Sequence, residues 1–159
     1  MSKTISSELT VDTVKIKNSE IVAWQNMMLS THGWYVHYMP STITKELVNI
    51  HTHGIYEKFK HEDFQIVIPL PDVLAQKIFS TLIDRIKDGD KFTNNQIVTG
   101  IIIGYSVKLV NAIDEDRIVL RIILPDKYSK LDMISMESPY HLQYTDLITN
   151  VRIYIEKRW

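Results

Sequence analysis

Three of the six histidines of this 159-residue chain lie close together in the sequence. In an extended strand alternate side chains share a face, so His51 and His53 would stand about 6–7 Å apart along one strand. Neutral imidazole is a common zinc ligand, and His61, after a short loop, is the candidate third ligand. Glu57 or Asp63 would supply an oxygen ligand or the general base for a metal-bound water. This arrangement of residues would be compatible with a metal-dependent hydrolase.

The same histidines also fit a structural role. Histidine is intermediate in burial and commonly has no part in catalysis. In this interpretation His51 and His53 are half-exposed strand residues, and His61 forms hydrogen bonds locally in a loop. Both interpretations remain open at the level of the sequence.

Known metal-site patterns are approached here without being completed. The metallo-isopeptidase pattern needs proline where Gly54 stands and serine where His61 stands. The cupin pattern lacks its glycines and second motif, and the metallo-β-lactamase pattern needs Asp-His where Ile55 and Tyr56 stand. A serine nucleophile elbow, a Walker loop and a dinucleotide fingerprint are absent. We therefore expect first a non-catalytic binding or accessory protein without a cofactor, and as the alternative a hydrolase with a divalent metal such as zinc.

Composition and charge exclude several classes of protein. Eighteen basic and nineteen acidic side chains give a net charge of −1, which argues against a nucleic-acid partner. Cysteine is absent, which removes disulfides, thiolate catalysis and Cys-ligated zinc and suits a reducing cytoplasm. The chain has no run of about eighteen apolar residues, so we expect no membrane association. A protein partner or self-association is the expected interaction.

Hydrophobic periodicity predicts two main helices, about 19–31 and 72–88, of which the second has the clearer apolar stripe. Residues 1–17 form a poorly defined arm or edge strand, and residues 18–159 form a single domain. Because strands cluster and βαβ repetition is absent, the fold class is α+β, with a mostly antiparallel or mixed sheet of about five to seven strands. Residues 111–116, with an acidic run, are expected to be a solvated hairpin connection. The expected strands are 34–39, 47–53, 64–68, one or two within 97–110, 117–124 and 151–155.

Several small motifs occur in a recurrent order. The segment around the second strand holds Thr52-x-Gly54-Ile55, Phe59 and His61-x-Asp63-Phe64; further along stand Leu70-Pro71, Ala75, Gly89, Phe92 and Leu124-Pro125-Asp126. This order resembles a bacterial family of domains of unknown function, DUF4262, over roughly residues 33–145. The resemblance implies a small cytosolic bacterial domain, and it implies no activity. Some members of such families serve as immunity proteins against toxins, so the resemblance suggests an immunity role by association only.

Two departures from that family pattern concern the candidate site. His51 and His53 stand where the family usually has an aromatic and an aliphatic residue, so a metal site on this pair would not be a family trait. Glu62 replaces the expected proline. His61 and Asp63 do match, and the resemblance therefore favours these two residues as any polar site that the family shares.

Overall fold

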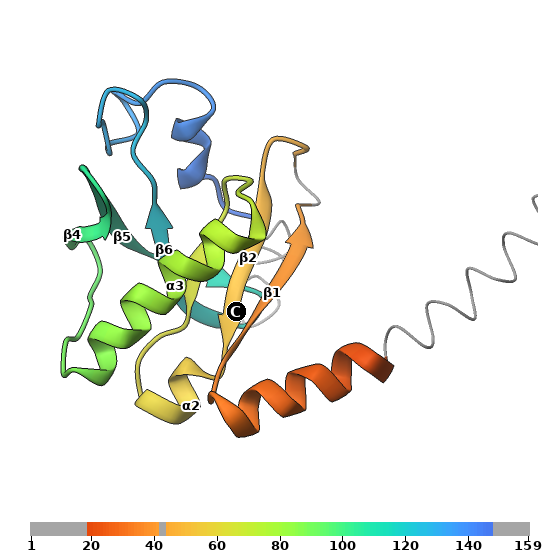
Figure 1. Cartoon of the computed structure of the whole chain (residues 1–159). Coiled ribbons are helices and arrows are strands. Elements are labelled where there is room, and N and C mark those ends of the chain that lie inside the picture. Colours follow the sequence, from red (N-terminus) through yellow and green to blue (C-terminus); the bar gives the residue numbers. More distant parts are fainter. Residues whose placement is uncertain (1–18, 42–43, 148–159) are drawn as a thin grey trace, which may run out of the picture. The chain divides into compact units, whose positions relative to one another are not determined.

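The computed structural model describes residues 19–41 and 44–147 (Figure 1). The chain divides into two compact units, Met1–Tyr35 and Val36–Trp159. The described part of the first unit contains a helix over residues 19–31, as predicted, which ends at Gly33 in a left-handed conformation with φ 85°. Within this unit the rings of Trp24 and Tyr35 meet edge to face. The predictions for residues 1–17 and 151–155 fall outside the described residues.

The second unit is built on a sheet of six strands in the order β1-β2-β3-β6-β5-β4. The pairs β2–β3, β5–β6 and β4–β5 are antiparallel, whereas β3 and β6 run parallel. The α+β class with a mixed sheet is therefore confirmed. The strands are β1 Tyr35–Pro40, β2 Val48–His53, β3 Phe64–Ile66, β4 Ile97–Ile102, β5 Tyr105–Asp114 and β6 Arg117–Ile123.

Helix α3, Asp72–Lys87, matches the predicted amphipathic helix and crosses the sheet (Figure 1). It begins after Pro71 and is followed by Gly89 at φ 105°, the usual asymmetry of start and stop residues. Its buried stripe anchors it to the core and consists of Ala75, Ile78, Phe79, Leu82 and Ile83. A short 3-10 helix, η1 Tyr140–Tyr144, lies further along the chain. No helix in residues 19–41 and 44–147 has the length and apolar character needed to cross a membrane.

The hairpin between β5 and β6 is shorter than predicted. Strand β5 continues to Asp114, which pairs in register with Arg117, so only Glu115 and Asp116 form the turn. Glu115 adopts the left-handed conformation that such a tight turn requires. The expectation of a solvated acidic tip at 111–116 is thus wrong for Asp114, which is 3% exposed. Its ion pair with Arg117 allows the carboxylate to be buried within the strand.

Strand register separates apolar from polar side chains on the central strands. Ile50 lies opposite Ile66, and both are fully buried. One residue along, His51 lies opposite Gln65, which in turn lies beside Arg121 of the parallel strand β6. Because neighbouring residues of a strand face opposite sides, His51, Gln65 and Arg121 share the face that Ile50 and Ile66 do not. This row of polar side chains positions the candidate site.

Candidate metal centre

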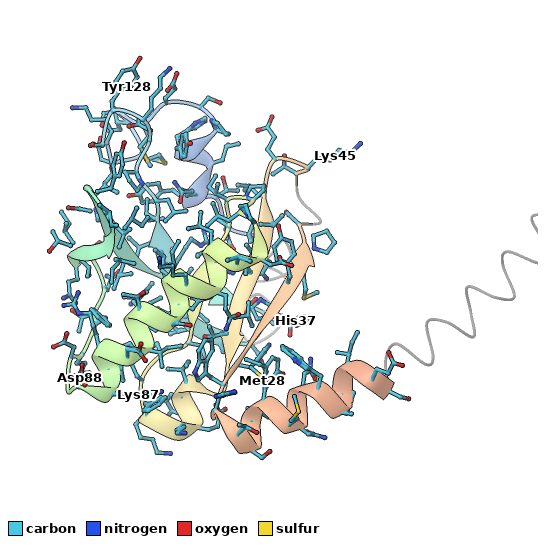
Figure 2. All side chains as sticks on the ribbon, viewed as in Figure 1. Met28, His37, Lys45, Lys87, Asp88 and Tyr128 are labelled. Carbon is cyan, nitrogen blue, oxygen red and sulfur yellow. The ribbon has the colours of Figure 1, made fainter. Side chains whose placement is uncertain are left out.

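Three histidines of the second unit meet on the polar face of the sheet. His37 comes from β1, where Figure 2 labels it, and His51 and His53 come from β2. One ligating nitrogen from each ring lies within 4.8 Å of the others. The ring centroids are 5.1 Å apart for His37 and His51, 5.9 Å for His37 and His53, and 4.8 Å for His51 and His53. We call these three residues the histidine cluster.

The spacing of the cluster is close to that of a metal site. Three atoms no more than 4.8 Å apart all lie within about 2.8 Å of a common point, roughly 0.7 Å beyond the usual Zn–N distance of about 2.0–2.1 Å. A shift of that size in each ring would allow the three nitrogens to ligate one ion.

Two polar side chains lie beside the Nδ1 atom of His51. Its Nδ1 lies 2.9 Å from Oδ1 of Asn49 and 3.8 Å from Oδ2 of Asp114. Burial lowers the pKa of His51 to about 4; Asp114 opposes this shift, while His53 adds to it. At neutral pH the imidazole is uncharged, the form that binds a metal ion.

His53 is half-buried and has a similar electrostatic setting. Burial lowers its pKa to about 4, Arg117 and His37 add to the shift, and Asp114 and Glu57 oppose it. Glu57 is exposed in the first turn of α2, Ile55–Phe59, a helix that begins directly after Gly54. His51 and His53 are thus uncharged at neutral pH, and the carboxylate of Glu57 is close enough to act on His53 electrostatically.

Asp114 gives the cluster a negative neighbour. Burial raises the pKa of this carboxyl, but a hydrogen bond from Asn49 and the charges of His51 and Arg117 outweigh burial, so the pKa falls below its ordinary value. Asn49 Nδ2 donates to Asp114 Oδ1 at 2.9 Å, and Arg117 bonds Oδ2 at 3.0 Å. The carboxylate is therefore ionised at neutral pH, beside the ring of His51.

His61 lies apart from the cluster and is fully engaged by the backbone. It is 3% exposed, its Nε2 accepts the N–H of Phe92 at 3.0 Å, and its Nδ1 lies 2.8 Å from the carbonyl oxygen of Glu62. Because Nε2 accepts, Nδ1 carries the hydrogen and donates. The structure thus brings together His51 and His53 and places His61 elsewhere, in the setting that the structural interpretation describes. Its role as a metal ligand stays a prediction, and the geometry does not favour it.

Asp63 holds the start of helix α2 to the end of strand β2. Its Oδ1 accepts the hydroxyl of Thr52 at 2.8 Å and the N–H of Ile55 at 3.1 Å, and its Oδ2 lies 3.2 Å from Arg117. Thr52 in turn accepts the N–H of Phe64 at 2.9 Å. We call these residues the Thr52–Asp63 network. Burial raises the pKa of Asp63, and the hydrogen bond from Thr52 and the charge of Arg117 oppose this shift.

Two features of this region were missed from the sequence. Helix α2 is only five residues long, too short for a periodic signal, and it lies in the segment before His61 that was expected to be a loop. The other feature is His37, which was not among the candidate ligands. The signal that would have found it is the neighbouring position of β1 and β2 in the sheet, which sequence separation conceals.

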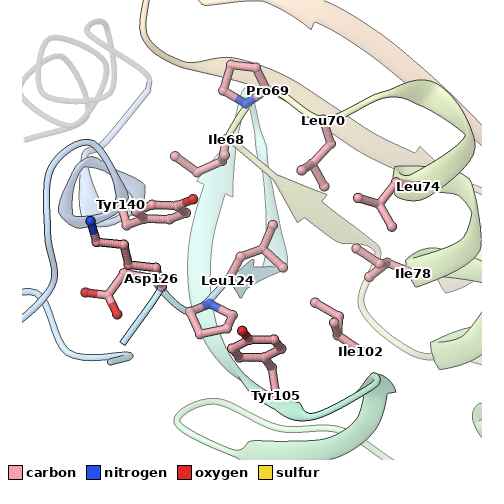
Figure 3. Close-up of a pocket in the computed structure, with 12 residues that line it drawn as sticks. Ile68, Pro69, Leu70, Leu74, Ile78, Ile102, Tyr105, Leu124, Asp126 and Tyr140 are labelled. Atoms are coloured by element: carbon pink, nitrogen blue, oxygen red, sulfur yellow. The ribbon is translucent and has the colours of Figure 1, made fainter. Parts of the chain in front are cut away.

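A separate concavity opens near the first turn of α3 (Figure 3). Its volume is about 330 Å³, and Ile68, Leu74, Ile78 and Leu124 form much of its wall, with the ring of Tyr105 beside them. The carboxylate of Asp126 at its rim accepts backbone N–H groups of Tyr128, Lys130 and Glu137. This carboxylate therefore stabilises its own loop, and the chemistry-bearing groups of the molecule gather at the histidine cluster instead.

The comparisons with known proteins give a family and no activity. A family model described as a domain of unknown function, DUF4262, matches residues 28–128. The chain belongs to this family. The match confirms the resemblance seen in the sequence, and the DUF4262 match includes all three residues of the histidine cluster as well as His61 and Asp63. No curated protein and no solved structure matches the chain.

Proposed function

We propose that this protein binds one divalent transition-metal ion through His37, His51 and His53 and acts as a metal-dependent hydrolase. The observation that carries the proposal is the convergence of three ligating nitrogens within 4.8 Å. The lowered pKa values of His51 and His53 support it, because both rings are uncharged at neutral pH and need not lose a proton to bind metal.

The chemistry of the donor set indicates which ions would bind. Three imidazole nitrogens without a thiolate suit zinc, copper, nickel or iron(II) better than magnesium or calcium, which prefer oxygen ligands. Catalytic zinc sites use three protein ligands and keep a fourth position for water, whereas structural sites use four. The cluster within the described residues has three members, which favours the catalytic arrangement.

Glu57 is the better candidate for the general base. Asp63 has Thr52, two backbone N–H groups and Arg117 around its two oxygens, so its lone pairs are committed. Glu57 is exposed and acts electrostatically on His53. A metal ion held by His37, His51 and His53 would lower the pKa of a water molecule, and Glu57 would be the residue that accepts the proton of that water.

Metal uptake tests the first half of the proposal. Untagged protein is stripped with a chelator and titrated with Zn²⁺ and with Co²⁺, and binding is followed by calorimetry and by the Co²⁺ absorption spectrum. We expect one equivalent of metal in the wild type and its loss in His37→Ala, His51→Ala and His53→Ala. His141→Ala, a histidine outside the cluster, is the matched control and retains full uptake. Wild-type uptake of less than about a tenth of an equivalent overturns the proposal.

Hydrolysis is tested separately on the metal-loaded protein. The probes are a 4-nitrophenyl ester and bis(4-nitrophenyl) phosphate, which report acyl and phosphoryl chemistry. We expect metal-dependent release of nitrophenol from one of them, a loss of activity of at least about 100-fold in Glu57→Gln, and unchanged metal uptake in that variant. A metal-loaded wild type that hydrolyses neither probe faster than free metal contradicts the hydrolase assignment.

A second candidate function is non-catalytic binding of a protein, either a partner or a second copy, as in an immunity-type protein of the bacterial cytosol. It is supported by apolar side chains on edge strand β4 and its turn, where Ile97 is 61% exposed and Ile103 is 96% exposed. Sedimentation velocity of the wild type and of Ile103→Lys tests self-association. A wild type that stays monomeric at high micromolar concentration removes self-association through this strand.

A further inference from the structure

We propose that a buried hydrogen-bond relay, Arg121–Gln65–Asn49, sets the tautomer of His51, so that Nδ1 carries the hydrogen and Nε2 is the atom that ligates metal. The inference deepens the proposed function and names three positioning residues, none of which belongs to the histidine cluster. The tautomer itself is a property of the metal-free protein, so this step stands or fails independently of metal uptake.

The direction of the relay is fixed at its first member. A guanidinium only donates, and Arg121 Nε donates to Gln65 Oε1 at 2.7 Å. The amide of Gln65 must therefore present its Nε2 on the other side, where it donates to Asn49 Oδ1 at 3.0 Å. If the Gln65 amide were turned over, its NH₂ group would face a donor-only group.

The opposite end of the relay independently fixes the same orientation of the amides. An ionised carboxylate only accepts, and Asp114 Oδ1 takes a hydrogen bond from Asn49 Nδ2 at 2.9 Å. Asn49 therefore has its oxygen directed away from Asp114. A donor-only arginine at one end and an acceptor-only aspartate at the other leave a single orientation for both amides between them.

The orientation of the Asn49 amide determines the tautomer of His51. His51 Nδ1 lies 2.9 Å from Asn49 Oδ1, and an amide oxygen cannot donate, so Nδ1 must carry the hydrogen. In a neutral imidazole the other nitrogen then holds the lone pair. Nε2 lies on the other side of the ring from Asn49, and it is the nitrogen left to ligate.

Burial makes the relay stiff. Gln65 is fully buried, His51, Asp114 and Arg121 are each 3% exposed, and Asn49 between them is half-buried. Water has little access to the bond between Arg121 and Gln65, so reversing that bond would leave buried donors or acceptors unsatisfied. Burial lowers the pKa of Arg121 only to about 10, and the guanidinium remains a donor at neutral pH.

Arg121 also joins the relay to a distant part of the chain. Its Nη1 donates to the carbonyl oxygens of Gln143, at 2.9 Å, and Thr145, at 2.6 Å. These carbonyls belong to η1 and the residue after it, so the guanidinium is clamped from two sides. The orientation of His51 therefore depends on residues as far along the chain as Thr145.

The ring-nitrogen shifts of His51 in chelator-treated wild type test the tautomer directly. Heteronuclear NMR at neutral pH distinguishes a protonated from a bare ring nitrogen, and His51→Gln provides the assignment. We expect Nδ1 protonated and Nε2 bare. A predominant Nε2–H form overturns the inference whether or not metal binds. Absence of metal uptake with the Nδ1–H form present overturns the proposed function and leaves the tautomer assignment in place.

Gln65→Glu tests the relay as the cause. This nearly isosteric change keeps an acceptor for Arg121 and removes the donor to Asn49. We expect part of the His51 population to change to Nε2–H and zinc affinity to fall about 10–100-fold, the usual effect of losing an outer-shell partner. Gln96→Glu, the same change at an amide outside the relay whose Oε1 accepts the N–H of Thr93 at 2.9 Å, is the matched control and leaves the tautomer unchanged. Equal tautomer populations in wild type and folded Gln65→Glu contradict the relay.

Discussion

Strand β2 carries two kinds of polar residue on its two faces, and they differ in what they contact. Thr52 belongs to the Thr52–Asp63 network, in which side-chain oxygens bond backbone N–H groups of α2 and β3. His51 and His53 face the other way and meet another histidine ring. A polar group that forms hydrogen bonds with the chain's own backbone maintains the fold. Imidazole nitrogens that converge on one another instead form a place for a ligand.

The same comparison separates the histidines. His61 has both ring nitrogens in hydrogen bonds to main-chain atoms, so it behaves as part of the backbone scaffold. His51 has one nitrogen bonded to Asn49 and another member of the cluster beside its ring. Of the candidates found in the sequence, His61 and Asp63 therefore bond the chain's own backbone, whereas His51 and His53 lie in the candidate site.

Asp63→Ala should have the largest effect on stability and should leave the metal ligands in place. The change leaves the buried hydroxyl of Thr52 and the N–H of Ile55 without their acceptor and removes one of the two carboxylates that pair with Arg117, at a cost of about 2–6 kcal/mol in the free energy of unfolding. Urea denaturation with and without Zn²⁺ measures this. A loss of less than about 1 kcal/mol would show that the Thr52–Asp63 network is not structural.

Acid should destabilise the metal-free protein through His51. Its pKa is about 4 in the folded protein against 6.5 ordinarily, so between those values the unfolded chain binds a proton that the folded chain does not. This stability is fully present above pH 6.5 and is lost as the pH falls towards 4, by up to about 3 kcal/mol. The measurement is the difference in unfolding free energy between wild type and His51→Gln, in chelator, across this range. A difference that does not change with pH contradicts the assignment.

His61→Phe should have a smaller effect, confined to stability. An aromatic ring is kept, and the buried N–H of Phe92 loses its acceptor, which costs about 1–3 kcal/mol. Zn²⁺ uptake should remain at the wild-type level, measured by the same titration as for the histidine cluster. Loss of metal binding in this folded variant would erase the distinction between the two sets of histidines.

Glu57→Gln should have the smallest effect on folding. The side chain is exposed in the first turn of α2, so the free energy of unfolding should change by no more than about 0.5 kcal/mol. Thermal and urea unfolding measure this beside the activity assays. A large loss of stability would show that Glu57 has a structural role with the Thr52–Asp63 network and not a role in the candidate site.

Much of the scaffold was predictable because its signals are local. The apolar stripe of residues 72–87 and the alternation that puts His51 and His53 on one face both depend on near neighbours in the chain. His37 and Asp114 were not found, because β1 lies beside β2, and Asp114 at the end of β5 meets Asn49 of β2, only in the folded chain. Asp114 also stands in an acidic run that reads as a solvated turn, although its partner Arg117 follows three residues later.

The parallel pairing of β3 with β6 has a consequence for how the protein reaches its native state. The stretch of sequence between Phe64 and its partner Leu120 contains α3, β4 and β5, so closing this pair requires ordering a long loop. The bonds from Arg121 to Gln65 and from Asn49 to Asp114 span that same junction. Chains that have formed only local hairpins and helices lack these bonds around the histidines of β2. Metal affinity would accordingly be lower until the sheet is complete.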